Sequence, residues 1–236
     1  MGPELAGPGW RGPGRTRPGR GLRIAGWAVL LPLGVVLVAA GLALRSAYPA
    51  HRVPSDAMRP TYAPGAMLYA ERVEPSEVRR GDVVLASVPE WGITEGLAVK
   101  RVIGVGGDRV RTDGRRLYVN GEALDEPYVR EGDPIGGAPD FDVTVPVGRV
   151  FLLGDNRGNS IDSRNHQDLG AGGTVPLAAV RERATDRPGP ALAGAGAFFG
   201  GVVVLLTGFG LGLAGSLAGR SARRRAVPPP APFPVP

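Results

Sequence analysis

Two long segments without charge set the first limit on the fold. Residues 24–44 are uncharged between Arg23 and Arg45, and residues 191–219 are uncharged up to Arg220. As a helix, the first segment is about 32 Å long, which matches the hydrocarbon core of a bilayer. The many glycines of the second segment disfavour a soluble helix but are common in membrane helices. The sequence therefore predicts two transmembrane helices.

A cleaved secretory signal is the alternative interpretation of the first segment. Its apolar stretch is longer than a typical signal core, its leader of 23 residues is long, and only Gly41 and Ala43 offer a weak cleavage-site spacing. Pro32 lies inside the segment, and such prolines are tolerated in membrane helices. These features favour a permanent anchor over a cleaved signal.

Charge is distributed unevenly along the chain. Residues 46–190 contain 18 basic and 21 acidic residues, whereas the two ends, residues 1–45 and 191–236, contain 10 basic residues and a single acidic one, Glu4. The slightly acidic central part argues against nucleic acid as a partner. The basic ends favour the lipid bilayer as the partner instead.

Positive charge also predicts the orientation in the membrane. Both basic clusters, residues 11–23 and 220–225, should face the cytoplasm, which leaves the segment between the helices outside.

Without cysteine, that segment must be held by its own core. The Gly/Pro-rich start and the Pro-rich end are predicted to have no fold of their own. The predicted order is a basic cytoplasmic tail, a transmembrane helix, an extracytoplasmic β domain, a second transmembrane helix and a basic, Pro-rich cytoplasmic tail, at residues 1–23, 24–44, 46–190, 191–219 and 220–236.

The segment between the helices has the pattern of a β domain. Short alternating runs are separated by Asp113-Gly114 and Asn120-Gly121, which are strong hairpin signals, and they predict an antiparallel meander. Apolar runs that adjoin glycines predict buried strands, and one short helical turn is expected near the end. The expected strands are 83–86, 109–112, 116–119, 122–124 and 148–153, and the expected turn is 176–180.

Three polar, Gly-rich segments are not explained by packing periodicity. They read PSDAMRPT at residues 54–61, VKRVIGVGGD at residues 99–108 and GDNRGNSIDSR at residues 154–164. In order and spacing they resemble the conserved boxes of bacterial type I signal peptidases, and the resemblance extends from residue 24 to about residue 185. It implies a mainly β, signal-peptidase-like domain of antiparallel sheets, anchored by one N-terminal and one C-terminal transmembrane helix.

The resemblance also implies an activity and its location. Type I signal peptidases are serine endopeptidases with a Ser/Lys dyad, and they cut the signal peptides of exported preproteins at the outer face of the bacterial plasma membrane without a cofactor. The implied partners are signal peptides, the lipid bilayer and the secretion translocon. The two histidines of this chain have no partner at metal-ligand spacing, so no metal site is predicted.

Lys100 matches the general base of this family. A lysine amine acts as a base near neutral pH only if its pKa falls from about 10.4 towards 7–8. Strand alternation puts Lys100 on one face with Ala98 and Val102, whose apolar side chains would desolvate it. Without the family box, an exposed lysine on a strand would be the ordinary interpretation.

Four further positions match family residues near the site. The resemblance implies that Ser160 orients the lysine amine and that Ser55 donates a hydrogen bond to the oxyanion. Asp162 and Arg164 are expected to form an ion pair that holds the loop carrying Ser160. Asp155, which follows a glycine, is expected to shape a turn.

The nucleophile position is occupied by Ala57, because it precedes the Met-x-Pro-Thr of the first box, Met58 to Thr61. A methyl group cannot attack a carbonyl. Residues two apart in an extended strand are about 6.6 Å apart, so Ser55 could replace the nucleophile only if the strand slipped.

Three interpretations stay open. The first is an active signal peptidase, which either uses a displaced Ser55 or carries Ala57 as an engineered change. The second is a catalytically silent paralogue, a possible pseudoenzyme, that binds signal peptides or an export partner as a regulatory module. The third is an unrelated membrane-tethered β module, which the third box disfavours.

Overall fold

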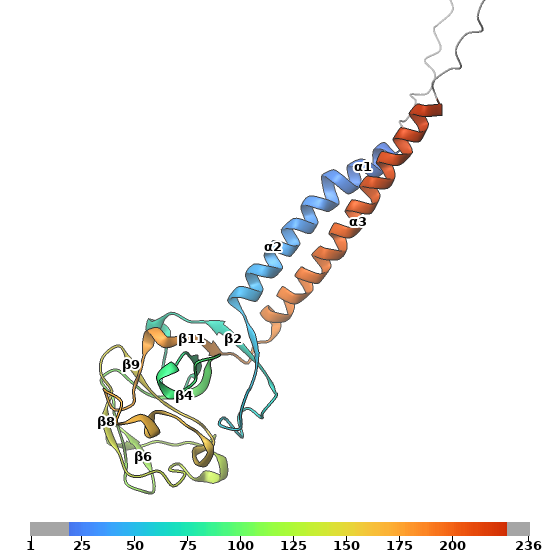
Figure 1. The fold of residues 1–236 in the computed structure, drawn as a ribbon. Coiled ribbons are helices and arrows are strands. Elements are labelled where there is room, and N and C mark those ends of the chain that lie inside the picture. The colour runs from blue at the N-terminus through green and yellow to red at the C-terminus, as the bar shows by residue number, and fades with distance from the viewer. Residues whose placement is uncertain (1–18, 226–236) are drawn as a thin grey trace, which may run out of the picture. The chain divides into compact units, whose positions relative to one another are not determined.

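The computed structural model describes residues 19–225, so the two predicted tails lie largely outside the described residues, at 1–18 and 226–236. The chain divides into two compact units. One unit comprises residues 1–43 with 194–236 and is helical in its described part. The other, residues 44–193, contains every strand of the described chain (Figure 1).

The helical unit contains two long apolar helices. The first comprises α1 (Arg20–Arg23), a π-helical stretch (Ile24–Leu30) and α2 (Leu31–Ala47), which follow one another without a break. The second is α3 (Gly189–Arg225). Residues Arg20–Ala47 and Gly189–Ala222 are long and apolar enough to cross a membrane. In their most apolar windows only 11% and 17% of the residues are buried, unlike the core helix of a soluble protein.

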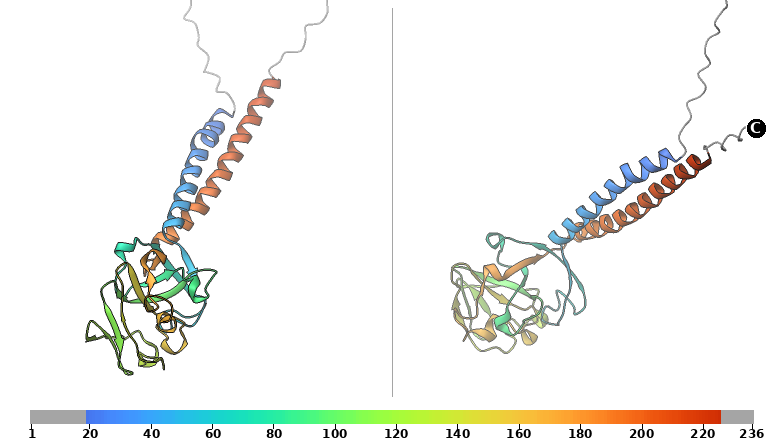
Figure 2. Two further views of the ribbon diagram at one scale, coloured as in Figure 1. Left: turned by 60° about the vertical axis from the view of Figure 1, so that its left-hand side comes forward. Right: turned by 45° about the horizontal axis from the view of Figure 1, so that its top comes forward.

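Glycines allow the two helices to approach closely. A Cβ atom on Gly34 would come within 2.9 Å of the Leu205 backbone nitrogen, and one on Gly201 within 2.7 Å of the Val38 nitrogen. Small residues at such contacts are the usual means by which membrane helices associate. The two helices accordingly run side by side in both views of Figure 2.

The β unit contains two antiparallel sheets. The larger sheet has the order β1-β2-β11-β3-β4-β9-β10 and the smaller one β7-β6-β5-β8. The strands are β1 (Ala50–Arg52), β2 (Met67–Arg72), β3 (Val83–Ala86), β4 (Ala98–Val105), β5 (Arg109–Thr112), β6 (Leu117–Val119), β7 (Glu122–Ala123), β8 (Asp142–Thr144), β9 (Arg149–Leu153), β10 (Val175–Pro176) and β11 (Val180–Ala184). Short 3-10 turns lie at Pro75–Glu77, Pro89–Trp91, Arg130–Gly132, Arg157–Asn159, Ser163–His166 and Leu177–Ala179.

Both faces of the central strands are buried, since every residue of β3 is buried. Apolar side chains of β3, β4 and β9 form one core, which includes Val84, Val102 and Leu152. The opposite face packs with β2 and with Met58, and Phe151 of β9 packs under the smaller sheet. The second box (residues 99–108, the lysine box) and the start of the third box are therefore attached to the buried centre of the larger sheet.

The predicted fold class, mainly β with an apolar helix near each end, is confirmed. The meander appears as β5, β6 and β7, with Val110 opposite Val119 and Tyr118 opposite Ala123. The predicted strands at 83–86 and 148–153 correspond to β3 and β9, and the predicted turn near residue 178 is a 3-10 turn.

Candidate active site

Lys100 lies in the middle of β4, opposite Val84 of β3. Its residue exposure is 5%, and within residues 19–225 it has no hydrogen-bond or ion-pair partner. Burial lowers the pKa of the Lys100 amine, and this effect is opposed by the negative charge of Asp162, reinforced by Arg164 and opposed again by Asp155. The side chain therefore has the environment of an amine that loses its proton easily.

The first box (residues 54–61, the serine box) is a turn-rich loop after β1. The expectation that it is an extended strand is wrong. Pro54 and Pro60 lack the N–H that a strand ladder requires. The loop is anchored by Met58, which is 1% exposed in the core beneath it. The 6.6 Å spacing expected for Ser55 and Ala57 therefore does not apply, since it assumed an extended strand.

Asn156 of the third box fixes the loop around Ala57. Its backbone N–H donates to the Ala57 carbonyl over 3.0 Å. Its side-chain amide donates to the Asp56 carbonyl over 3.1 Å and to the Asp56 carboxylate over 3.0 Å. Position 57 is thus held directly against the third box.

Gly154 permits this close approach. A Cβ atom there would overlap the Ser160 hydroxyl and lie 2.6 Å from the Ala57 carbonyl oxygen. Arg101 pairs with Leu153 across β4 and β9, so the register brings Lys100 level with Gly154. Positions 57, 100 and 160 therefore meet around this glycine. The buried Ser160 hydroxyl has no hydrogen-bond partner in the described part of the chain, so its predicted bond to Lys100 stays a prediction.

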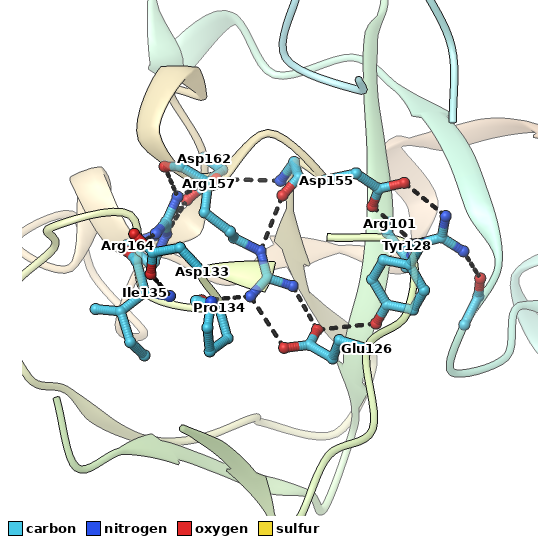
Figure 3. Close-up of polar contacts among 12 residues, drawn as sticks. Arg101, Glu126, Tyr128, Asp133, Pro134, Ile135, Asp155, Arg157, Asp162 and Arg164 are labelled. Carbon is cyan, nitrogen blue, oxygen red and sulfur yellow. Dashed lines mark hydrogen bonds and ion pairs between the residues drawn. The ribbon is translucent and has the colours of Figure 1, made fainter. Parts of the chain in front are cut away.

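Asp162 and Arg164 form a buried bidentate ion pair, with Nε and Nη2 of the arginine each 2.9 Å from a carboxylate oxygen. The Gly154 N–H donates to the same carboxylate over 3.1 Å, and Arg164 also donates to the carbonyls of Ile135 and Arg157. The ion pair between Asp162 and Arg164 (Figure 3) and these further contacts close the loop that carries Ser160.

Asp155 does more than shape a turn. Its carboxylate is fully buried and accepts two hydrogen bonds from Arg101, over 2.8 and 2.6 Å, and one from the Thr61 hydroxyl. One carboxylate of the third box therefore binds Arg101, the residue after Lys100 (Figure 3), and also Thr61, the last residue of the first box. The sequence contained a signal for this pairing, because all three residues lie in the family boxes.

A groove of about 430 Å³ lies between the first box and the segment that ends at Lys100. Ser55 and Lys100 both line it, so the two predicted polar groups open onto one space. Much of the remaining lining is apolar, and His51, Arg52 and Glu95 add charge or polarity. The apolar lining includes Val53, Met58, Leu85, Ile93, Leu97, Ala98 and Val99.

The two histidines have local partners. The His51 Nε2 lies 2.6 Å from a carboxylate oxygen of Glu182, and the His166 ring stacks on Trp91 with ring centroids 5.1 Å apart. Within residues 19–225, no three His, Asp or Glu side chains are grouped closely enough to hold a metal ion.

The antiparallel β unit and the two apolar helices define a β protein with two potential membrane spans. A family model described as signal peptidase, peptidase S26, matches residues 25–186. This match spans more than half of the chain, and the chain belongs to the peptidase S26 family of signal peptidases.

Two relatives agree with this assignment by sequence, and one solved structure is also similar. Signal peptidase I of Bacillus licheniformis is 34% identical over 149 residues, which cover 59% of this chain and 77% of the relative. A probable signal peptidase I-1 of Synechocystis is 38% identical over 143 residues, covering 56% of this chain and 70% of the relative. A crystal structure of a signal peptidase I from Enterococcus faecalis V583 is 30% identical, covers 46% of this chain and 97% of that chain, and has a TM-score of 0.37.

Proposed function

We propose that this chain binds the signal peptides of exported preproteins in the groove beside Lys100. Its site corresponds to a signal-peptidase active site that lacks the nucleophile. The observation that carries the proposal is the meeting of positions 57, 100 and 160 around Gly154, with Ala57 at the nucleophile position. The mostly apolar lining of the groove suits an extended peptide with apolar side chains.

Each site residue has a defined role in this proposal. With a serine at position 57, the neutral Lys100 amine would take the hydroxyl proton as the oxygen attacks the substrate carbonyl. Ser55 would donate a hydrogen bond to the developing oxyanion, and Ser160 would orient the amine. Lys100 would then return the proton to the leaving amine. With Ala57, peptide binding remains and the attack has no nucleophile.

Ser55 is a poor substitute for the missing serine. Moving it into position 57 would break the three hydrogen bonds that Asn156 makes to residues 56 and 57 and would pull Met58 out of the core. At about 0.5–1.5 kcal/mol for each hydrogen bond and about 1.5–3 kcal/mol for the methionine, the shift costs several kcal/mol. The loop therefore favours a silent, peptide-binding protein over a displaced nucleophile.

Restoring the serine tests the proposal. Ala57→Ser should cleave a preprotein with an Ala-x-Ala site faster than the starting chain by several orders of magnitude, since losing such a nucleophile costs on the order of 10⁶-fold in rate. The assay uses the full chain in detergent, with Ala57→Ser/Lys100→Met as the inactive control. Cleavage by the starting chain that disappears in Ser55→Ala would instead support a displaced nucleophile.

Peptide binding is measured separately. A fluorescent, non-cleavable signal-peptide analogue should bind the starting chain and Ala57→Ser with similar affinity, because the substitution adds one oxygen beside the groove. If neither protein binds or cleaves, although both are folded, the resemblance extends only to the scaffold.

We also propose that the β unit lies outside the plasma membrane, with both ends of the chain in the cytoplasm. Contact with the secretion translocon stays a prediction. The basic clusters that flank the two apolar helices support this orientation. Protease added to spheroplasts should digest residues 46–190 and spare tags at both ends. Protection of the β unit would contradict the two-span topology.

A further inference from the structure

The segment from Glu126 to Arg130, outside the three boxes, contacts all of them through alternate residues. Its first contact is made by Glu126, whose carboxylate accepts hydrogen bonds from both terminal nitrogens of Arg157. The two side chains are 4% and 1% exposed. Arg157 in turn donates from Nε to the Gly154 carbonyl over 2.9 Å. Glu126 thereby supports the glycine around which the site is assembled.

Tyr128 makes the second contact. Its hydroxyl donates to the Glu126 carboxylate over 2.8 Å, and its ring lies under the Arg101 guanidinium, 3.9 Å from the ring centroid (Figure 3). Such a cation–π contact holds the guanidinium in place. Because Arg101 follows Lys100 and also pairs with Asp155, Tyr128 supports the lysine box.

Arg130 makes the third contact. Its backbone N–H donates to the Asp155 carbonyl over 3.0 Å, and its guanidinium donates to the Asp56 carboxylate over 3.2 Å. Asp56 directly precedes the nucleophile position. The side chains of Glu126, Tyr128 and Arg130 thus reach the third, second and first box in turn.

We propose that residues 126–130 form a positioning segment that sets the geometry between the Lys100 amine and position 57. Tyr128 and Arg130 are positioning residues, since they act through Arg101 and Asp56. The proposal rests on the proposed function for the identity of the two positioned groups. The contacts that define the segment stand independently of any activity.

Tyr118 of β6 provides a matched control. Its hydroxyl donates to Asp113 over 2.7 Å, and its ring lies under Arg111, 4.1 Å from the centroid, so it repeats both interactions of Tyr128. Within residues 19–225, the Tyr118 side chain makes no polar contact with any of the three boxes. Replacing either tyrosine removes one hydrogen bond to a carboxylate and one contact with an arginine. Of the two tyrosines, only Tyr128 contacts the boxes.

The first readout is the pKa of Lys100, which is the only lysine in the chain. Isotope-labelled lysine gives one side-chain signal in the full chain in detergent. Tyr128→Leu should raise the pKa by about one pH unit, because a loosened Arg101 neutralises Asp155 less well and the Asp155 charge raises the pKa of the amine. The nearby charges of Asp162, Arg164 and Asp155 are unchanged in this variant. Tyr118→Leu should leave the pKa where it is.

The second readout is turnover in the Ala57→Ser background. Tyr128→Leu should lower kcat on the order of 10²-fold with little change in KM, since a small misplacement of reacting groups has that effect. Tyr128→Phe keeps the ring under Arg101 and should restore most of the rate. Tyr118→Leu should behave as the background.

A third variant avoids any loss of folding. Arg130 is partly exposed, and Arg130→Met removes its contact with Asp56. It should lower kcat, whereas Arg109→Met, which removes the exposed Arg109–Asp142 pair, should not. The proposal is overturned if folded Tyr128→Leu leaves the Lys100 pKa unchanged, or if the two tyrosine variants have equal effects. If Ala57→Ser is inactive, the proposed function is wrong. The titration of Lys100 in the two tyrosine variants still tests the positioning segment in that case.

Discussion

Arg157 and Arg164 lie as deep in the β unit as Lys100, but each arginine is paired with a carboxylate and the lysine is not. Arg157 pairs with Glu126 and Arg164 with Asp162, and all four side chains are less than 5% exposed. Lys100 has no such partner within residues 19–225. The arginine fork suits fixed bidentate pairing, whereas a lysine changes its pKa readily when buried.

This difference distinguishes the structural arginines from Lys100, the proposed base. The paired arginines, together with the Arg101–Asp155 pair, connect the boxes through fixed contacts (Figure 3). A base must instead gain and lose a proton during turnover, and an ion-pair partner would hold the proton on it. Within residues 19–225, the site is therefore surrounded by paired, buried charges, whereas the buried amine of Lys100, the proposed base, has no ion-pair partner.

The largest expected effect comes from removing a paired arginine. Arg164→Met leaves the Asp162 carboxylate buried without its partner, which should lower the free energy of unfolding by about 3–5 kcal/mol. Chemical unfolding of the full chain in detergent, followed by tryptophan fluorescence, measures this change. Arg109→Met, at an exposed pair, is the control and should have little effect. Equal effects of the two would break the distinction between buried scaffold and exposed surface.

Removing the unpaired lysine should have a smaller effect of opposite sign. Lys100→Met exchanges a desolvated amine for an apolar side chain of similar length and leaves no partner unsatisfied. The free energy of unfolding should stay unchanged or rise by up to about 2 kcal/mol, measured in the same unfolding experiment. A loss as large as that of Arg164→Met would mean that Lys100 is a structural cation.

The smallest effect is a dependence of stability on pH. Because the pKa of Lys100 is lowered on folding, the unfolded chain binds more protons between that pKa and 10.5. Stability contributed by this group should therefore increase with pH across that window. The difference in unfolding free energy between the starting chain and Lys100→Met should therefore become smaller as the pH rises through this window. A difference that is independent of pH would argue against a lowered pKa.

Features encoded in neighbouring residues could be predicted from the sequence. Hydropathy predicted residues 24–44 and 191–219, which lie within the apolar helices, and the Asp-Gly and Asn-Gly turns predicted the meander. Lys100 was expected to be buried because strand alternation and the family box agreed. Each of these signals is contained in one short segment.

Contacts between distant segments could not be predicted in this way. Glu126 and Arg157 are separated by 31 positions, and Asp56 and Arg130 by 74, and no local sequence pattern predicts such pairs. The loop form of the serine box was missed for a related reason. Its shape depends on Met58 in the core and on Asn156, which is 100 positions away from Asp56.

The central claim is that Lys100 is a buried amine kept without a partner, and its own titration tests this most directly. Since no other lysine is present in the chain, isotope-labelled lysine reports this amine alone. The full starting chain, titrated by NMR in detergent, should give a pKa well below 10.5, because burial disfavours the charged form. A pKa at or above 10.5 would contradict the account, since it would mean that the amine is solvated or paired.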